Sequence, residues 1–165
     1  MTTRDTVPAV LVHALATSLT ACARTPKPPA QDVAATTAAL PRMVVHKSPS
    51  CVCCAKWVKH LREAGFSVDI RNEGKLEPVK TRLGVPAAQH SCHTAQVRGY
   101  FVEGHVPVED IKRLLVEKPY ARGLALAGMP MGSPGMESPS GRIEPFTVSL
   151  VGHDGSTTPF AQHGR

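Results

Sequence analysis

Apolar and polar residues change their spacing along this chain, and each spacing predicts a different element of secondary structure. The short apolar run 43–46 predicts a β-strand. In residues 54–64 the side chains of Trp57, Val58 and Leu61 recur at helical spacing, which predicts an amphipathic helix. A strand followed directly by a helix is therefore expected after residue 42.

The same patterns continue toward the C-terminus as alternating strands and helices. They predict a strand over 66–70, a helix over 76–83, strand material over 94–102 with a turn or bulge at Gly99, a helix over 108–117, and a β-hairpin formed by 146–151 and 157–161 around an Asp-Gly turn. This alternation favours an α/β fold in which helices flank a sheet. Because the first helix begins at a cysteine cluster directly after the first strand, we expect a thioredoxin-like sheet with an added C-terminal β-hairpin.

The N-terminal residues have a different character, and we expect them to lie outside the folded domain. Residues 1–22 resemble an export signal, with an apolar stretch behind Arg4 and small residues at its end. Residues 23–42 are rich in Pro, Ala and Thr, which is typical of a linker. The folded domain is therefore expected to span residues 43–165.

The end of the predicted export signal resembles a bacterial lipobox. Leu19-Thr20-Ala21-Cys22 has the small residues and the cysteine that this motif combines. The resemblance implies a periplasmic protein that is anchored to the membrane as a lipoprotein through Cys22. The alternative is an N-terminal tail in which this cysteine is incidental.

Composition and charge exclude two classes of protein. No apolar run reaches the ~20 residues that a membrane-spanning helix needs, so this is not a polytopic membrane protein. The net charge is +6, but the basic residues are dispersed, and the chain has only one Trp, two Tyr and four Phe for stacking on bases. We therefore expect no nucleic-acid partner, and membrane contact only through the N-terminal anchor.

The sharpest chemical feature is a group of three cysteines, Cys51, Cys53 and Cys54, near the start of the first predicted helix. Backbone N–H groups and the helix dipole stabilise thiolates at such a position. A fourth cysteine, Cys92, is followed by His93 and comes just before the third predicted strand. In a thioredoxin-like fold this point lies against the Cys-x-x-Cys loop, so we expect the four thiols and His93 to converge.

Three interpretations of these cysteines are open. They form a structural disulfide or buried thiols, they exchange disulfides through Cys51 and Cys54, or they bind a soft metal. Adjacent Cys53 and Cys54 are poorly placed to chelate one tetrahedral ion together with Cys51, but they are well placed to bridge several ions. Thiolates select Cu(I), whereas structural zinc sites prefer two separated Cys-x-x-Cys pairs.

A second set of soft donors lies in residues 128–136, whose Gly and Pro content predicts a loop. Met129, Met131 and Met136 carry thioethers, which are suitable ligands for Cu(I). We expect this segment to form a mobile lid or delivery loop for the metal. The alternative is that these methionines fill gaps beneath the loop.

The histidines other than His93 carry less weight. His46 ends the first predicted strand and His105 follows the third, and both are interpreted as structural side chains rather than ligands. His60 falls on the polar side of the first helix, where we expect it to be solvated.

Several separated motifs agree, in order, with one known family. The segment His46-Lys47-Ser48-Pro49-Ser50-Cys51-Val52-Cys53-Cys54-Ala55-Lys56-Trp57 resembles the opening motif of the CopG copper-resistance proteins, an exported bacterial family long catalogued as a domain of unknown function. Four later motifs match as well, at residues 83–86, 91–94, 102–107 and 128–137. The resemblance runs from about residue 43 to residue 161.

The resemblance implies a thioredoxin-like fold and a copper site on four cysteines, which correspond to Cys51, Cys53, Cys54 and Cys92. It also implies a cysteine-bridged copper cluster and a role in periplasmic copper detoxification through redox cycling of the metal. This chain has Val52 where the family usually has Gly, and a β-branched residue does not easily adopt a positive φ.

Together these observations predict an exported protein of copper resistance that binds more than one Cu(I) ion. His93 is expected to be a further ligand or an orienting residue, and other periplasmic copper-handling proteins are the expected partners. The alternative is a thioredoxin-like thiol–disulfide oxidoreductase that uses Cys51 and Cys54. The sequence leaves open whether the domain oxidises or reduces copper.

Overall fold

The computed structural model describes residues 39–164. The predicted export signal, Cys22 and most of the predicted linker lie outside these residues and stay predictions. Within the described part of the chain, no helix is long and apolar enough to cross a membrane. The elements are, in chain order, β1 (Met43–Lys47), α1 (Val52–Glu63), β2 (Val68–Asn72), α2 (Glu77–Leu83), a 3-10 turn (Ala87–Gln89), β3 (His93–Val97), β4 (Tyr100–Glu103), α3 (Val108–Glu117), β5 (Gly123–Ala125), β6 (Phe146–Val151) and β7 (Thr157–His163).

The strands form one seven-stranded sheet in the order β2-β1-β3-β4-β5-β6-β7. β1 pairs in parallel with β2, while β3 is antiparallel to both β1 and β4. β5 runs parallel to β4 and joins this part to the antiparallel hairpin of β6 and β7. The arrangement confirms the predicted α/β class, with a thioredoxin-like sheet and a C-terminal hairpin.

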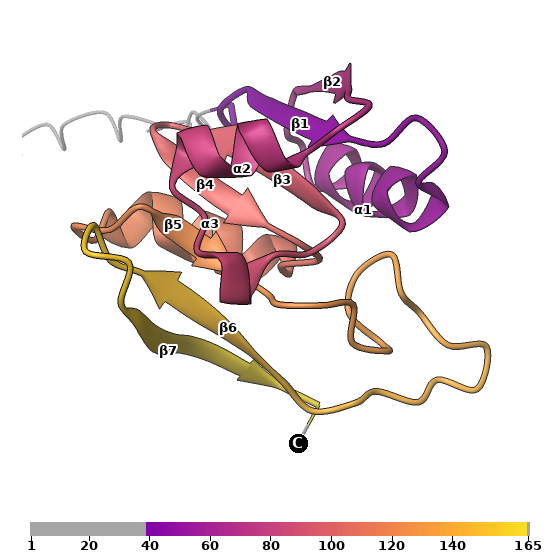
Figure 1. The fold of residues 1–165 in the computed structure, drawn as a ribbon. Coiled ribbons are helices and arrows are strands. Elements are labelled where there is room, and N and C mark those ends of the chain that lie inside the picture. The colour runs from indigo at the N-terminus through magenta and orange to yellow at the C-terminus, as the bar shows by residue number, and fades with distance from the viewer. Residues whose placement is uncertain (1–38, 165) are drawn as a thin grey trace, which may run out of the picture. The chain divides into compact units, whose positions relative to one another are not determined.

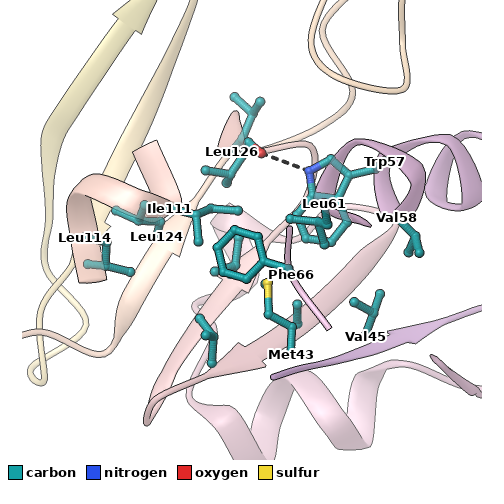
Figure 2. Close-up of a cluster of buried hydrophobic side chains, with 14 of the residues drawn as sticks. Met43, Val45, Trp57, Val58, Leu61, Phe66, Ile111, Leu114, Leu124 and Leu126 are labelled. Atoms are coloured by element: carbon teal, nitrogen blue, oxygen red, sulfur yellow. Dashed lines mark hydrogen bonds between the residues drawn. The ribbon is translucent and has the colours of Figure 1, made fainter. Parts of the chain in front are cut away.

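Helices cover both faces of the sheet (Figure 1). α1 and α3 lie on one face and bury Trp57, Leu61, Ile111 and Leu114 in the main core, together with Met43 and other side chains of the strands (Figure 2). Burying a large apolar side chain of this kind stabilises the fold by roughly 1.5–3 kcal/mol. α2 lies on the other face, where a smaller apolar cluster of Leu83, Val85, Phe101, Ala125 and Val151 forms.

The predicted elements differ from the observed ones mainly at their ends. α1 begins at Val52, two residues earlier than expected, because Cys51 is its N-cap. Val52 is therefore a helical residue, and the positive-φ residues other than glycine in the described chain are Arg98 and Lys118. A β-branched side chain at this position causes no backbone strain, and it points outward with 71% exposure.

Two short elements were not predicted. β5 has three residues and the turn Ala87–Gln89 also has three, so neither is long enough to produce a recognisable period. The helix over 108–117 and the strand over 146–151 have the predicted bounds, and β7 extends two residues beyond its prediction. The overlooked β5 matters because the methionine-containing segment begins just after it.

Candidate metal centre

Three of the four cysteines of the predicted site are brought together by the first turn of α1. Cys51 is the N-cap, and its Sγ accepts a hydrogen bond from the Cys54 N–H at 3.3 Å. Cys51 and Cys54 form a disulfide, and Cys53 Sγ lies 3.5 Å from Cys51 Sγ. Within the described residues, Cys53 and Cys92 are the free cysteines.

Cys92 reaches this turn because of the sheet topology. β3 is antiparallel to β1, and His93 pairs with Lys47, so β3 begins where β1 ends. Cys92 Sγ consequently lies 3.6 Å from Cys54 Sγ. The ligand atoms of all four cysteines lie within 4.8 Å of one another, so the sulfurs converge as expected.

Two imidazoles border the Cys92 thiol. His93 Nδ1 lies 3.3 Å and His105 Nε2 lies 3.0 Å from Cys92 Sγ. His105 Nδ1 donates to the Pro134 carbonyl at 2.8 Å, which leaves the Nε2 lone pair facing the thiol. Cys92, His93 and His105 thus form a second group of converging ligand atoms that shares one sulfur with the first.

His93 is held tightly in the interior. Its ring is 0% exposed and lies 4.3 Å from the Trp57 ring, centroid to centroid. Its Nε2 is buried without a hydrogen-bond partner among the described residues. Buried polar atoms are nearly always paired, so this ring nitrogen is an exception among the described residues.

His105 is the site residue that sequence reasoning missed. It was interpreted as structural, yet it contacts the thiol of Cys92. The hairpin of β3 and β4 explains this position, because Thr94 pairs with Glu103 and the chain beyond β4 returns to the start of β3. The predicted turn at Gly99 was the sequence signal that could have revealed this contact, because a hairpin around Gly99 brings the residues after β4 back to the start of β3.

His46 does behave as a structural residue. Its Nδ1 lies 2.8 Å from Glu73 Oε1, and its Nε2 lies 2.9 Å from the side chain of Gln96. Both ring nitrogens are therefore engaged away from the four sulfurs.

Burial determines the protonation of Cys92, His93 and His105. Burial, with a contribution from Cys53, raises the pKa of Cys92 to about 12. Burial also lowers the pKa of His93 well below its usual value, and the neighbouring His105 adds to this effect. The pKa of His105 is lowered by burial as well, although its hydrogen bond to Pro134 acts in the opposite direction. Cys92 is thus a neutral thiol beside two neutral imidazoles at neutral pH.

The methionines that the sequence singled out line one cavity together with two of the cysteines. This cavity has a volume of about 700 Å³, and its walls include Cys51, Cys53, Met129, Met131 and Met136. Met129 is 51% exposed and Met131 is 36% exposed, so these two do not fill gaps in the core. A role for these two methionines as metal ligands stays a prediction.

The methionine-containing segment, residues 128–137, is fastened to α1 rather than free along its whole length. Gly135 has a φ of 88°, and a Cβ there would lie 2.7 Å from the Cys53 carbonyl oxygen. Glu137 accepts a hydrogen bond from the Gly135 N–H at 2.6 Å and pairs with His60 Nε2 at 2.6 Å. The His60 side chain is 40% exposed, in agreement with the expectation that it is solvated, and it makes in addition this surface contact across 77 residues of sequence.

The donor set suits a soft metal. Four sulfurs, two neutral imidazoles and three thioethers surround one region, and soft sulfur ligands select Cu(I). The unpaired Nε2 of His93 agrees with a site whose side chains are arranged for something besides packing. Cys51 and Cys54 can act as thiolate ligands only after their disulfide takes up two electrons.

A sheet of this topology, with cysteines at the first helix and at the facing loop, defines a thioredoxin-like protein with a thiol centre. Residues 89–136 match the model of a family described as a protein of unknown function, DUF411. No curated protein matches the sequence significantly.

Two solved structures of copper resistance protein CopG are similar to this chain over most of its length. Form 2 is 41% identical, with a TM-score of 0.72, and the match covers 75% of this chain and 98% of the CopG chain. Form 1 is 40% identical, also with a TM-score of 0.72, and the match covers 76% and 99% of the two chains. This chain therefore belongs to the CopG copper-resistance family.

Proposed function

We propose that this protein is an exported copper-binding protein of copper resistance that binds Cu(I) through the thiolates of Cys51, Cys53, Cys54 and Cys92. The observation that carries the proposal is the convergence of four sulfurs within 4.8 Å of one another. Family membership adds support, because the related solved structures are of a copper resistance protein.

The site is proposed to hold more than one copper ion. Cys53 Sγ lies 3.5 Å from Cys51 Sγ and Cys92 Sγ lies 3.6 Å from Cys54 Sγ, on either side of the Cys51–Cys54 disulfide, so the four sulfurs form one continuous series. A thiolate can bridge two metal ions, and adjacent cysteines on one helical turn favour bridging over chelation of a single ion. The N-terminus of α1 partly offsets the negative charge of the thiolates.

His93 and His105 are proposed to support Cys92. Copper binding requires Cys92 to lose its proton, and metal affinity therefore depends on pH. His105 Nε2 lies 3.0 Å from Cys92 Sγ with its lone pair directed at the thiol. His93 is proposed as an additional ligand or an orienting residue through its Nδ1.

The three methionines are proposed to receive copper at the outer side of the centre. Met129, Met131 and Met136 share a cavity with Cys51 and Cys53, and thioethers bind Cu(I) without needing to lose a proton. The segment would pass copper ions arriving from other periplasmic copper-handling proteins to the thiolates. Export through residues 1–22 and anchoring through Cys22 complete this proposal.

Anaerobic titration of the reduced chain with Cu(I), in competition with a chromophoric chelator, tests the proposal. We expect saturation above one equivalent of copper. The variant with all four site cysteines changed to serine should lose this binding, whereas Cys22→Ser should keep it. Equal binding by the fourfold variant and the parent would reject the proposal.

A second candidate function is thiol–disulfide exchange. The observation that favours it is the disulfide between Cys51 and Cys54 at the start of α1. In that reaction a substrate thiolate attacks one sulfur of the disulfide, a mixed disulfide forms, and the other cysteine leaves as a thiolate. Cys92 and the methionines would have no necessary role.

The variant Cys92→Ala separates the two functions. If copper binding is the function, this variant should lose copper tolerance in cells while its Cys51–Cys54 pair still forms a disulfide. If exchange is the function, its disulfide reductase activity should equal that of the parent and copper tolerance should not change.

A further inference from the structure

A buried charged network lies beneath α2, on the face of the sheet opposite α1, and neither function above uses it. Glu103 on β4 is 0% exposed, and Lys80 on α2 is 3% exposed. The Lys80 ammonium donates to Glu103 Oε1 and, at 3.0 Å, to Thr94 Oγ1. The Thr94 hydroxyl in turn donates to Glu103 Oε2 at 2.5 Å.

The same carboxylate reaches the loop that carries Cys92. The Ser91 N–H donates to Glu103 Oε1 at 2.6 Å, and Ser91 immediately precedes Cys92. The Ser91 hydroxyl donates to the carbonyl of Gly128 at 2.5 Å, and Gly128 immediately precedes Met129. Through one serine, the buried carboxylate is therefore connected to both segments that carry sulfur ligands.

The backbone next to Glu103 is shaped for this contact. Gly104 has a φ of 75°, and a Cβ there would lie 2.8 Å from Ser91 Cβ and 2.4 Å from the carbonyl oxygen of Leu126. The Gly104 N–H also donates to the His93 carbonyl at 3.0 Å. The loop before β3 thus packs directly on the end of the strand that holds the carboxylate.

Stability alone does not account for this network. Replacing a buried ion pair with apolar residues of similar size is often neutral or stabilising, because both charges must be desolvated. A carboxylate, however, accepts several hydrogen bonds at once. Here it accepts from an ammonium, a hydroxyl and the N–H of Ser91, and an apolar pair could not hold that N–H.

We propose that Glu103 is a positioning residue of the metal centre: through Ser91 it holds Cys92 against the first turn of α1 and holds the start of the methionine-containing segment in register. The inference deepens the proposed function and rests on it for the identity of the ligand, Cu(I). Losing such a supporting contact typically lowers metal affinity by about 10- to 100-fold.

The first test is Glu103→Gln in the reduced full chain. Glutamine keeps the size of the side chain. Its NH₂ group, however, would face groups that are themselves donors: the Lys80 ammonium, the Thr94 hydroxyl or the Ser91 N–H. We expect Cu(I) affinity, measured by chelator competition, to fall at least about tenfold. Glu109→Gln on α3 is the matched control, because this carboxylate is 80% exposed, and its copper affinity should equal that of the parent.

A double variant separates positioning from stability. Lys80→Met with Glu103→Leu removes both charges, so neither is left buried and unpaired. We expect its resistance to urea to match or exceed that of Glu103→Gln, while its copper affinity stays as weak. Recovery of the parent's copper affinity in this double variant would overturn the proposal.

A copper-free measurement keeps this inference distinct from the proposed function. In a chain whose other four cysteines are serine, Cys92 is the single thiol, and iodoacetamide reports how firmly its loop is held. Adding Glu103→Gln should accelerate alkylation about tenfold, because the loop is released. Equal rates would overturn the positioning role even if copper binds. Faster alkylation in a protein whose parent does not bind copper would instead reject the copper function alone.

Discussion

The cysteine centre has two sides that differ in exposure and in donor chemistry. The outer side faces the cavity and consists of Cys51, Cys53 and the three methionines of residues 128–137. The inner side faces the sheet and consists of Cys54, Cys92, His93 and His105. Sulfur is the donor on the outer side, whereas imidazole nitrogen accompanies sulfur on the inner side.

In the proposed function, this difference separates two requirements of a site that exchanges its metal. On the inner side, Cys54, His93 and His105 are 0% exposed and packed against the core, so their positions depend on the fold. On the outer side, Met129 and Met131 are exposed and can move without disturbing the core. Selection of the metal would therefore rest on the rigid side, and its entry and exit on the accessible one.

The largest expected effect is on the inner side, at Trp57. Its ring is 0% exposed, packs on His93, and donates from Nε1 to the Val106 carbonyl at 2.9 Å. Trp57→Ala should lower the free energy of unfolding by about 3–5 kcal/mol in urea denaturation. Met129→Ala on the outer side should change it by less than about 0.5 kcal/mol. Similar losses in both variants would remove the distinction between the two sides.

Gly135 joins the two sides, and its substitution should have the next largest effect. Gly135→Ala places a Cβ against α1 at a positive φ, which should cost about 1–3 kcal/mol of stability. Gly155 also has a positive φ, of 82°, but no atom lies within 4 Å of a Cβ there, so Gly155→Ala reports backbone strain alone. Calorimetric unfolding of both variants isolates the contact with α1. A smaller loss for Gly135→Ala than for Gly155→Ala would mean that the segment is not fastened there.

The inner side should also make the metal-free protein sensitive to acid. Burial lowers the pKa of His93, so the unfolded chain binds a proton that the folded chain excludes. Stability should consequently fall as pH drops below about 6.5, with a slope that approaches about 1.4 kcal/mol per pH unit for this one group. Urea denaturation between pH 7 and pH 5 measures the slope, and His93→Gln should make it shallower. An unchanged slope in that variant would assign the acid sensitivity to other groups.

The smallest effect on stability is expected for the outer methionines. The double variant Met129→Leu and Met131→Leu keeps an apolar surface, so its unfolding free energy should stay within about 0.5 kcal/mol of the parent. Copper transfer from a chelator, followed by stopped-flow absorbance, should nevertheless become slower. Val116→Leu on α3 is the matched control, because it exchanges one exposed apolar side chain for another away from the cavity. Equal loading rates in all three proteins would leave these methionines without a role in entry.

Much of the fold could be predicted because its signals are local. α3 and the strand Phe146–Val151 have the predicted bounds, since glycine, proline and a clear period mark where such elements begin and end. β5 was not predicted because its three residues are too few to show a period. The convergence of Cys92 with the first helix was predicted because the topology alone places the start of β3 beside the end of β1.

The remaining parts of the site depend on contacts that have no local signature. His105 reaches Cys92 through the register of a hairpin, and His60 reaches Glu137 across a long loop. Glu103 looks like an ordinary polar residue at the end of a strand until burial beneath α2 gives it Lys80 and the Ser91 N–H as partners. Such roles arise from side-chain direction and burial, which a single sequence does not encode position by position.

The sequence by itself indicated the α/β fold class through its periodicity, the family through the resemblance of several separated motifs, and the candidate sulfur donors through the spacing of cysteine and methionine. The tertiary structure alone decided which donors are rigid and which are accessible, since exposure depends on how α1, the sheet and residues 128–137 pack together. It also decided that two histidines rather than one border Cys92, and that a buried carboxylate accepts a hydrogen bond from the residue before it. Close packing brings residues that are distant in the chain within hydrogen-bonding reach. The two sides of the centre differ because different segments pack against each of them.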